Sequence, residues 1–370
     1  MRCGKKRNDS HAGCRILLMR RFFGSYPNLI ERQSVMATDT RIPVIILTGF
    51  LGSGKTTILA HVMEFIDPAR TEIVINEYGS VGLDQYLIQQ VKEETQVLKG
   101  GCVCCQLRSD LVAVLQQVAN RIDSGEHIDR VIIETSGLAD PAPIMFTIYT
   151  DPMLQNRFRI GGVITTVDAT THSPLGPHPE WVKQITSADW VIITKTDIAD
   201  QQGVVMLGRQ IRAMNPSATI FTAKNGHIEQ EAEFLKDLLS ANGRENLGLQ
   251  NDLPSSVSDR RDSNSATASL SLRFAGSVNW SAFSVWLSML LHAHGEHILR
   301  IKGLLDVGSA GPIVLNGVQH IVHPPIHLSE WPDEDTVSRL VIIVRGIDPD
   351  RILDSLHKFR RFIGAALVKV

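Results

Sequence analysis

The chain has 370 residues, of which 43% are apolar and 21% are charged, and its formal net charge is −2. This length exceeds that of one typical compact domain, so we expect two domains with extensions. The near-neutral charge gives no electrostatic reason to bind nucleic acid or a membrane surface. No apolar run approaches the ~20 residues that cross a bilayer, and the basic N-terminus lacks the apolar stretch of a signal peptide. We therefore expect a cytoplasmic protein.

Residues 1–40 mix basic and polar side chains without periodicity. Met36 begins the run MATDTRIPVIILTGF, which leads directly into the first predicted strand. We expect residues 1–40 to be an N-terminal extension that is disordered or that lies upstream of a natural start.

Between residues 41 and 240, short β-branched runs alternate with helical stretches. Such alternation predicts an α/β domain with a doubly wound, mostly parallel sheet. The predicted strands are Val44–Leu47, Glu72–Ile75, Arg130–Ile133, Gly162–Val167, Trp190–Ile193 and Ala218–Thr222. The predicted helices are Thr56–Phe65, Arg108–Ile122 and Gln201–Met214.

Residues 241–267 have the polar composition of a linker, rich in Ser, Asn and Asp. The pattern of residues 268–370 predicts a smaller C-terminal α+β domain. Its predicted strands are Ser269–Phe274, Ile298–Val307, Pro312–Val322 and Leu340–Val344, and its predicted helices are Trp280–His292 and Pro349–Phe359.

The segment GFLGSGKT at residues 49–56 fits the phosphate-binding P-loop pattern, between a predicted strand and a predicted helix. Its glycines let backbone N–H groups surround phosphate oxygens. We expect Lys55 to neutralise the β- and γ-phosphates and Thr56 to ligate Mg²⁺. The alternative is a glycine-rich turn with a chance lysine. The predicted nucleotide-binding residues here are Gly49, Gly52, Ser53, Gly54, Lys55, Thr56 and Thr57.

The run Thr194-Lys195-Thr196-Asp197 follows the predicted strand Trp190–Ile193. A carboxylate at Asp197 can accept two hydrogen bonds from guanine, whereas adenine would leave it unpaired. The usual GTPase sequence is Asn-Lys-x-Asp, so Thr194 keeps a hydroxyl but lacks the amide. We predict that Lys195 and Asp197 bind GTP, while a solvated turn is the alternative.

Glu134 ends the strand before the run Glu-Thr-Ser-Gly137. An acidic residue at this point reaches Mg²⁺ through water or positions the attacking water, so we assign it a catalytic role together with Lys55. Gly137 would bring its backbone N–H to the γ-phosphate. An acidic strand end without this role is the alternative.

Three of the five cysteines lie at Cys102, Cys104 and Cys105. In a reducing compartment such a cluster indicates metal binding or redox chemistry. Three thiolates on zinc leave an open coordination position, which suits transfer better than storage. Soft sulfur favours Zn²⁺ or Cu(I) over Mg²⁺. A dithiol redox centre and ordinary packed cysteines remain alternatives.

Several histidines fall in pairs or triplets, and we expect them to be ordinary loop or surface residues. They are His172 and His178, His292, His294 and His297, and His323 and His327.

These motifs together resemble the CobW family of metal-handling GTPases, from about Ile42 to the C-terminus. The resemblance lies in GFLGSGKTT, INEYGSVGLD, LKGGCVCC, IIETSGLADP and TKTD, and in ILRIKGLL, NGVQH and SRLVIIVRG nearer the C-terminus. It implies that Cys102, Cys104 and Cys105 are the metal ligands. It also implies that Asn76–Asp84 is a switch region connecting nucleotide state to the metal.

Two departures from the family pattern stand out in the sequence. Thr194 replaces the common Asn, and Ser80 stands where many members have a second glutamate, so an auxiliary acidic metal ligand is in doubt. The family includes zinc-transfer chaperones and proteins of cobalamin synthesis and nitrile hydratase maturation, so cobalt and iron stay open beside zinc.

The resulting hypothesis is a GTPase of slow intrinsic turnover that carries Zn²⁺ to a client apo-metalloprotein, with a homodimer reasonable for this class. No clear arginine finger is visible, which is why turnover is expected to be slow. The rivals are a P-loop enzyme such as a small-molecule kinase, a metal-binding scaffold with a vestigial nucleotide site, and a cysteine redox protein.

Overall fold

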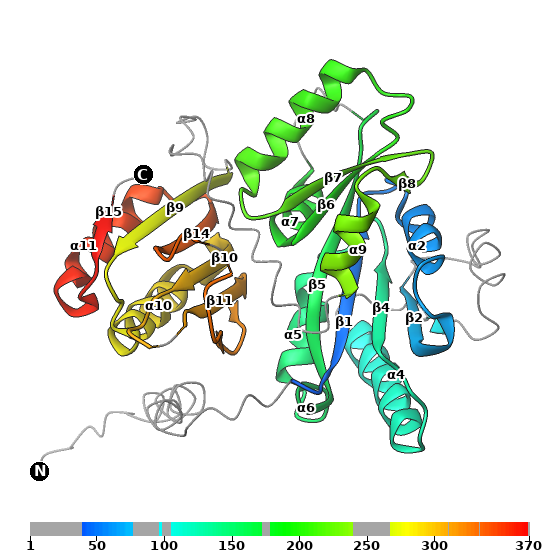
Figure 1. The fold of residues 1–370 in the computed structure, drawn as a ribbon, viewed down its shortest axis with the longest axis horizontal. Helices are drawn as coiled ribbons and strands as arrows, with labels where there is room; N and C mark the ends of the chain where they lie inside the picture. Colours follow the sequence, from blue (N-terminus) through cyan, green and yellow to red (C-terminus); the bar gives the residue numbers. More distant parts are fainter. Residues whose placement is uncertain are drawn as a thin grey trace, which may run out of the picture. The chain divides into compact units, whose positions relative to one another are not determined.

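The structure is a computed structural model that describes residues 39–76, 96–97, 105–171, 178–239, 267–309, 311–332 and 334–368. Residues 41–370 form one compact unit. Within this unit, two sheets organise the chain (Figure 1).

The first sheet has eight strands in the order β3-β2-β4-β1-β5-β6-β7-β8. All neighbouring pairs are parallel except β7 and β8. The expectation of a doubly wound, mostly parallel sheet is therefore confirmed. The strands are β1 (Ile42–Gly49), β2 (Thr71–Asn76), β3 (Gln96–Val97), β4 (Arg130–Thr135), β5 (Phe158–Asp168), β6 (Trp190–Thr194), β7 (Thr219–Lys224) and β8 (His227–Ile228).

Helices cover both faces of this sheet, because successive strand residues point to opposite sides. Val44 and Ile46 of β1 share a buried cluster with α4 and α5, while Ile45 and Leu47 share another with α2 and α9. Helices α7 and α8 pack on β5 and β6 in a third cluster. The helices are α2 (Lys55–Met63), α4 (Cys105–Asp123), α5 (Ala142–Thr150), α6 (Leu154–Arg157), α7 (Pro179–Ser187), α8 (Gln201–Met214) and α9 (Glu231–Leu239), with a short 3₁₀ turn η1 (Pro68–Arg70).

The second sheet is antiparallel, in the order β12-β11-β10-β14-β9-β15, and β13 pairs with β11. This sheet and its two helices form the expected α+β domain. Its elements are β9 (Thr267–Ala275), α10 (Trp280–His294), η2 (Gly295–His297), β10 (Ile298–Leu305), β11 (Ile313–Val318), β12 (Ile321–Val322), β13 (Ile326–His327), β14 (Ser338–Arg345), α11 (Pro349–Ile363) and β15 (Ala366–Val368).

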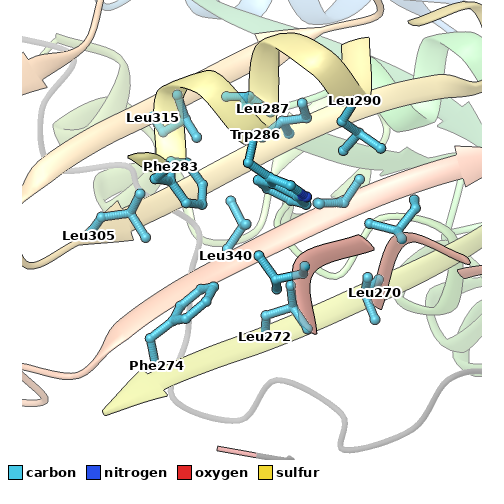
Figure 2. Packing of buried hydrophobic residues seen from close by; sticks show 14 of the residues in the cluster. Leu270, Leu272, Phe274, Phe283, Trp286, Leu287, Leu290, Leu305, Leu315 and Leu340 are labelled. Atoms are coloured by element: carbon cyan, nitrogen blue, oxygen red, sulfur yellow. The ribbon is translucent and has the colours of Figure 1, made fainter. Parts of the chain in front are cut away.

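The core of the second domain lies between its sheet and helices α10 and α11 (Figure 2). Phe283 and Trp286 of α10 point onto the sheet, and both are almost fully buried. The Trp286 indole N–H donates to Ser355 Oγ of α11 at 3.0 Å. This bond satisfies the one polar group that the indole brings into the core.

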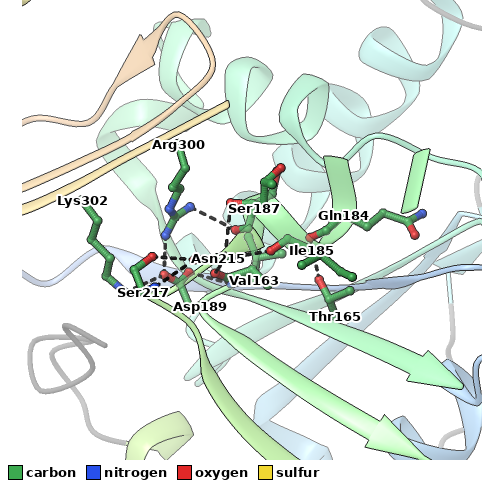
Figure 3. Close-up of polar contacts among 12 residues, drawn as sticks. Val163, Thr165, Gln184, Ile185, Ser187, Asp189, Asn215, Ser217, Arg300 and Lys302 are labelled. Carbon is green, nitrogen blue, oxygen red and sulfur yellow. Dashed lines mark hydrogen bonds and ion pairs between the residues drawn. The ribbon is translucent and has the colours of Figure 1, made fainter. Parts of the chain in front are cut away.

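The opposite face of the second sheet contacts the first domain. Leu299, Leu304, Val341 and Ile343 share a buried cluster with residues of α7 and α8. Beside this apolar contact, Asp189 forms ion pairs with Arg300 and Lys302 of β10 (Figure 3). All three residues are buried, so a charged cluster lies within the contact between the two domains.

The predicted single strand Pro312–Val322 is wrong, because the chain reverses within it. β11 and β12 form a hairpin in which Val318 pairs with Ile321, so Gln319 and His320 make a two-residue turn. Gln319 has a φ of 54°, a left-handed conformation that glycine or asparagine usually supplies. Apolar residues alternate on both sides of this turn, so the sequence pattern does not reveal it.

His327, expected in a loop, lies in β13, and His323 is buried.

Candidate functional site

The P-loop joins β1 to α2 at the carboxyl edge of the parallel sheet. Gly49 has a φ of 145°, and a Cβ placed there would lie 2.3 Å from Thr166 Oγ1. Gly54, with a φ of 86°, is the residue immediately before α2. Both positions therefore require glycine. The resulting turn directs the chain into the N-terminus of α2, and the backbone N–H groups of a helix N-terminus favour an anion.

Side chains of the P-loop are held by its own backbone and by β5. Lys55 Nζ donates to the carbonyl oxygens of Gly49 at 3.1 Å and Phe50 at 3.3 Å. Ser53 Oγ lies 2.6 Å from Thr166 Oγ1. The amine of Lys55 is thus kept at the loop, where it can turn to a phosphate group.

Two predicted residues from different elements meet beside the P-loop. Thr56 Oγ1 donates to Glu134 Oε1 at 2.7 Å, which joins α2 to the end of β4. Three residues further on, a Cβ at Gly137 would lie 2.7 Å from the Leu51 backbone nitrogen. A side chain there would displace the loop. Thr56 and Glu134 offer two oxygen ligands of the kind that Mg²⁺ prefers, so the residues fit this ion.

Thr194 lies beneath the P-loop. Its hydroxyl donates to the Ser53 carbonyl at 2.8 Å, with the Val167 carbonyl at 3.2 Å. It therefore connects β6 to the loop. The hydroxyl that Thr194 keeps where the usual GTPase sequence has Asn is therefore hydrogen-bonded to the P-loop backbone.

Lys195 and Asp197 follow β6 at the same sheet edge. Lys195, with a φ of 58°, extends Nζ to within 2.6 Å of Asp168 Oδ2 at the end of β5. Burial raises the pKa of Asp168, but hydrogen bonds from Lys195 and Thr170 outweigh it and hold this pKa below its usual value. The carboxylate thus stays charged and fixes the lysine.

The exposed carboxylate of Asp197 accepts the backbone N–H of Asn225 at 3.1 Å. Thr196 Oγ1 donates to the Ala223 carbonyl at 3.0 Å. A Cβ at Gly226 would lie 2.7 Å from Thr57 Cγ2. The turn after β7 therefore closes the site between Asp197 and the P-loop helix.

Sequence reasoning missed Asp168 and the turn at Asn225-Gly226. Both carried a signal: an acidic residue ends the buried run of β5, and Asn-Gly follows the run of β7. His178, expected in a loop, stacks on Phe50 of the P-loop, with 5.2 Å between the ring centroids. This ring therefore lies beside the nucleotide loop.

The cysteine prediction falls mostly outside the described residues. This holds for Cys102, Cys104 and most of Asn76–Asp84, including Ser80, and also for His172. The backbone of Cys105 begins α4, and β3 precedes the cluster. Within the described ranges, no three His, Cys, Asp or Glu side chains are grouped to hold a metal.

His292 and His294 lie in the last turn of α10, and His297 Nδ1 lies 3.0 Å from the Arg345 carbonyl oxygen.

No helix in the described part of the chain is both long enough and apolar enough to span a membrane.

Two family models match the chain. The nucleotide-binding domain of CobW, HypB and UreG matches residues 43–222, and the C-terminal domain of the cobalamin synthesis protein CobW matches residues 267–360. The first match covers most of the parallel sheet, and the second covers most of the antiparallel sheet.

Individual proteins are similar over most of the chain. The zinc chaperone YjiA of Escherichia coli K12 is 30% identical over 82% of this chain and 93% of its own length. The zinc chaperone CobW of Pseudomonas aeruginosa is 29% identical over 88% of this chain and 94% of its own. The crystal structure of the Zn(II)-bound YjiA GTPase from E. coli superposes with a TM-score of 0.60 and 24% identity, covering 86% of this chain and 99% of the other. The chain therefore belongs to the CobW family of P-loop GTPases.

Proposed function

We propose that this protein is a GTP-hydrolysing metallochaperone that binds Zn²⁺ through Cys102, Cys104 and Cys105 and delivers it to a client apo-metalloprotein. The observation that carries the proposal is the pairing of Thr56 with Glu134 beside the P-loop, at the carboxyl edge of the parallel sheet to which β3 also belongs. The names of the relatives, zinc chaperones, support zinc as the cargo. Cobalt and iron are the other metals that the family resemblance allows.

The nucleotide chemistry is assigned to residues of the site. The P-loop backbone and Lys55 bind the phosphates, and Asp197 selects guanine. Mg²⁺, which Thr56 would hold with Glu134 close by, supplies neutralising charge at the phosphates. Glu134 orients water, and the Gly137 N–H stabilises negative charge on the γ-phosphate. Slow intrinsic turnover is part of the proposal, because the sequence offers no clear arginine to stabilise the transition state.

Topology supports a physical link between this site and the cysteines. The carboxyl ends of parallel strands share one edge of a sheet, and the P-loop follows β1 while the cysteine segment follows β3. These strands are three places apart in the sheet, which at roughly 4.8 Å per strand amounts to about 14 Å. Loops at such spacing can communicate through the segments between them.

Helix α5 provides one such segment. It follows the loop that contains Glu134 and Gly137, and its residues Phe146 and Thr150 contact Arg108 near the start of α4. Arg108 Nη2 donates to Thr150 Oγ1 at 3.2 Å, and its guanidinium lies 5.5 Å from the Phe146 ring centroid. Cys105 lies one helical turn before Arg108. A shift of the Gly137 loop would therefore reach the cysteine segment through α5.

The test measures hydrolysis and metal binding in the same preparations. Wild-type protein should prefer GTP to ATP and bind one Zn²⁺. Lys55→Ala should lower kcat/KM for GTP about 100-fold and keep the metal. Replacing Cys102, Cys104 and Cys105 by serine should abolish stoichiometric zinc and keep GTP binding.

Each rival predicts a different result. Preference for ATP, with turnover unchanged by the cysteine substitutions, would indicate a kinase-like enzyme. Client activation that survives Lys55→Ala would indicate a scaffold. A reversible disulfide among the three cysteines, without bound metal, would indicate a redox protein.

A further inference from the structure

The loop between β4 and α5 contacts the C-terminal domain as well as the nucleotide site. We propose that the β11–β12 hairpin, through Gln319, positions this loop and thereby sets the rate of GTP hydrolysis. Gln319 would be a positioning residue supplied by one domain to the catalytic loop of the other. This inference rests on the proposed GTPase function.

The loop is first held from within its own domain. Gln184 of α7 is fully buried, and its Nε2 donates to the carbonyl oxygens of Gly137 at 3.1 Å and Ala139 at 3.0 Å. Figure 3 shows Gln184 on the helix that ends near Asp189. Since Gly137 also lies against Leu51, these bonds hold the loop close to the P-loop.

Asp140 then connects the same loop to the second domain. Its Oδ1 accepts the Ala142 N–H at 3.0 Å, which fixes the start of α5. Its Oδ2 lies 3.1 Å from Gln319 Nε2 and 3.1 Å from Lys183 Nζ. One carboxylate therefore joins the loop, α7 and the hairpin, although Gln319 and Asp140 are 179 residues apart.

The rest of the hairpin packs along α5. Val318 is fully buried in the cluster that contains Met145 and Ile148. The ring centroids of His320 and Phe146 are 5.8 Å apart, and those of His323 and Tyr149 are 4.5 Å apart. The hairpin and α5 should therefore move together, so that the loop at the start of α5 responds to the position of the C-terminal domain.

The backbone at Gln319 provides a separate observation. A two-residue hairpin turn with φ of 54° favours glycine or asparagine, and glutamine is strained there. Strained non-glycine residues cluster at functional sites. Here the side chain reaches Asp140.

The test replaces the hydrogen-bond donor of Gln319 by an acceptor and then replaces the acceptor of Asp140 by a donor. Gln319→Glu places two carboxylates together and should lower kcat for GTP about fivefold, with KM changed less than twofold, because the phosphate and base contacts are untouched. Adding Asp140→Asn restores a donor opposite Glu and should return kcat to within twofold of wild type. Gln210→Glu, the same change at an exposed position of α8, is the matched control and should have no effect.

Hydrogen exchange of the backbone amides of residues 137–140 and 142 is measured in the nucleotide-free proteins, since Pro141 has no N–H. Exchange should be faster in Gln319→Glu than in wild type or Gln210→Glu, and slow again in the double variant. Equal exchange in all four proteins, or a kcat that Gln319→Glu leaves unchanged, would overturn the inference. If wild-type protein does not hydrolyse GTP, the proposed function fails, and the exchange pattern alone decides whether Gln319 positions the loop.

Discussion

The two faces of the C-terminal sheet differ in chemistry. Toward α10 and α11, β14 presents Leu340, Ile342 and Val344 to an apolar core. Toward the first domain, Val341 and Ile343 lie in a cluster that adjoins the charged residues Asp189, Arg300 and Lys302. The first face resembles the interior of a domain, and the second combines apolar contact with buried charge.

The buried charges on the face toward the first domain are stabilised by pairing with one another. Burial raises the pKa of Asp189, but the charges of Arg300 and Lys302 outweigh this effect and hold the pKa below its usual value. Asp189 Oδ2 also accepts the Val163 N–H at 3.0 Å, and Arg300 Nη1 donates to the Ser187 carbonyl at 3.0 Å. Charged hydrogen bonds depend on direction, whereas apolar contacts do not, so the charged face is the more sensitive to a change in domain orientation. We therefore expect the apolar face to stabilise the domain and the charged face to fix its orientation.

The largest effect is expected at the charged face. Asp189→Ala leaves Arg300 and Lys302 buried without a carboxylate and should lower the free energy of unfolding by about 3–5 kcal/mol. Urea titration followed by tryptophan fluorescence measures this loss. Asp123→Ala, which removes an exposed partner of Arg157, is the control and should cost less than about 1 kcal/mol. Similar losses of unfolding free energy in both variants would show that the buried ion pairs contribute no more to stability than the exposed one.

A smaller effect is expected in the apolar core. Leu287→Ala on the inner face of α10 should cost about 3 kcal/mol through lost burial and a cavity. Met289, two residues further on, is 54% exposed, and Met289→Ser should change stability by less than about 0.5 kcal/mol. The same urea titration compares the two. A cost for Met289→Ser equal to that for Leu287→Ala would mean that another surface covers α10.

The smallest effect is a pH dependence at the hairpin. Burial, aided by the positive charge of Arg300, lowers the pKa of His323 to about 3. The unfolded chain binds a proton below about pH 6.5 and the folded chain does not, so stability is full above pH 6.5 and falls as the pH drops toward 3. The loss between pH 6.5 and 5 should be about 1.6 kcal/mol. His323→Phe should remove this part of the slope, and an identical slope in both proteins would contradict the assignment.

Much of the fold could be predicted because its signals are local. The P-loop glycines, the buried strand runs and the longer helical stretches each lie within one short segment. Helices α5, α7 and α9 are short and were not predicted, and Gln319 lacks the glycine or asparagine that marks a turn.

Contacts across the fold could not be predicted from the sequence. Thr56 and Glu134 were each assigned from a motif, but their hydrogen bond joins residues 78 positions apart. Asp140, Arg300 and Gln319 lie within the quoted blocks IIETSGLADP, ILRIKGLL and NGVQH, but nothing in those blocks pairs Asp140 with Gln319, or Arg300 with Asp189, 111 positions away. Such pairs depend on how the two domains meet, which local patterns do not encode.

If GTP hydrolysis drives zinc delivery as we propose, the affinity of the protein for zinc depends on which nucleotide is bound, and a competition titration measures this dependence. Full-length protein competes with a chromophoric chelator for Zn²⁺ in the presence of a non-hydrolysable GTP analogue, of GDP, or of no nucleotide. We predict that zinc affinity differs at least about fivefold between the GTP-analogue and GDP states. Coupling free energies between two binding sites are typically about 1–3 kcal/mol, and the lower value corresponds to about fivefold. Equal zinc affinity in all three states would contradict this prediction.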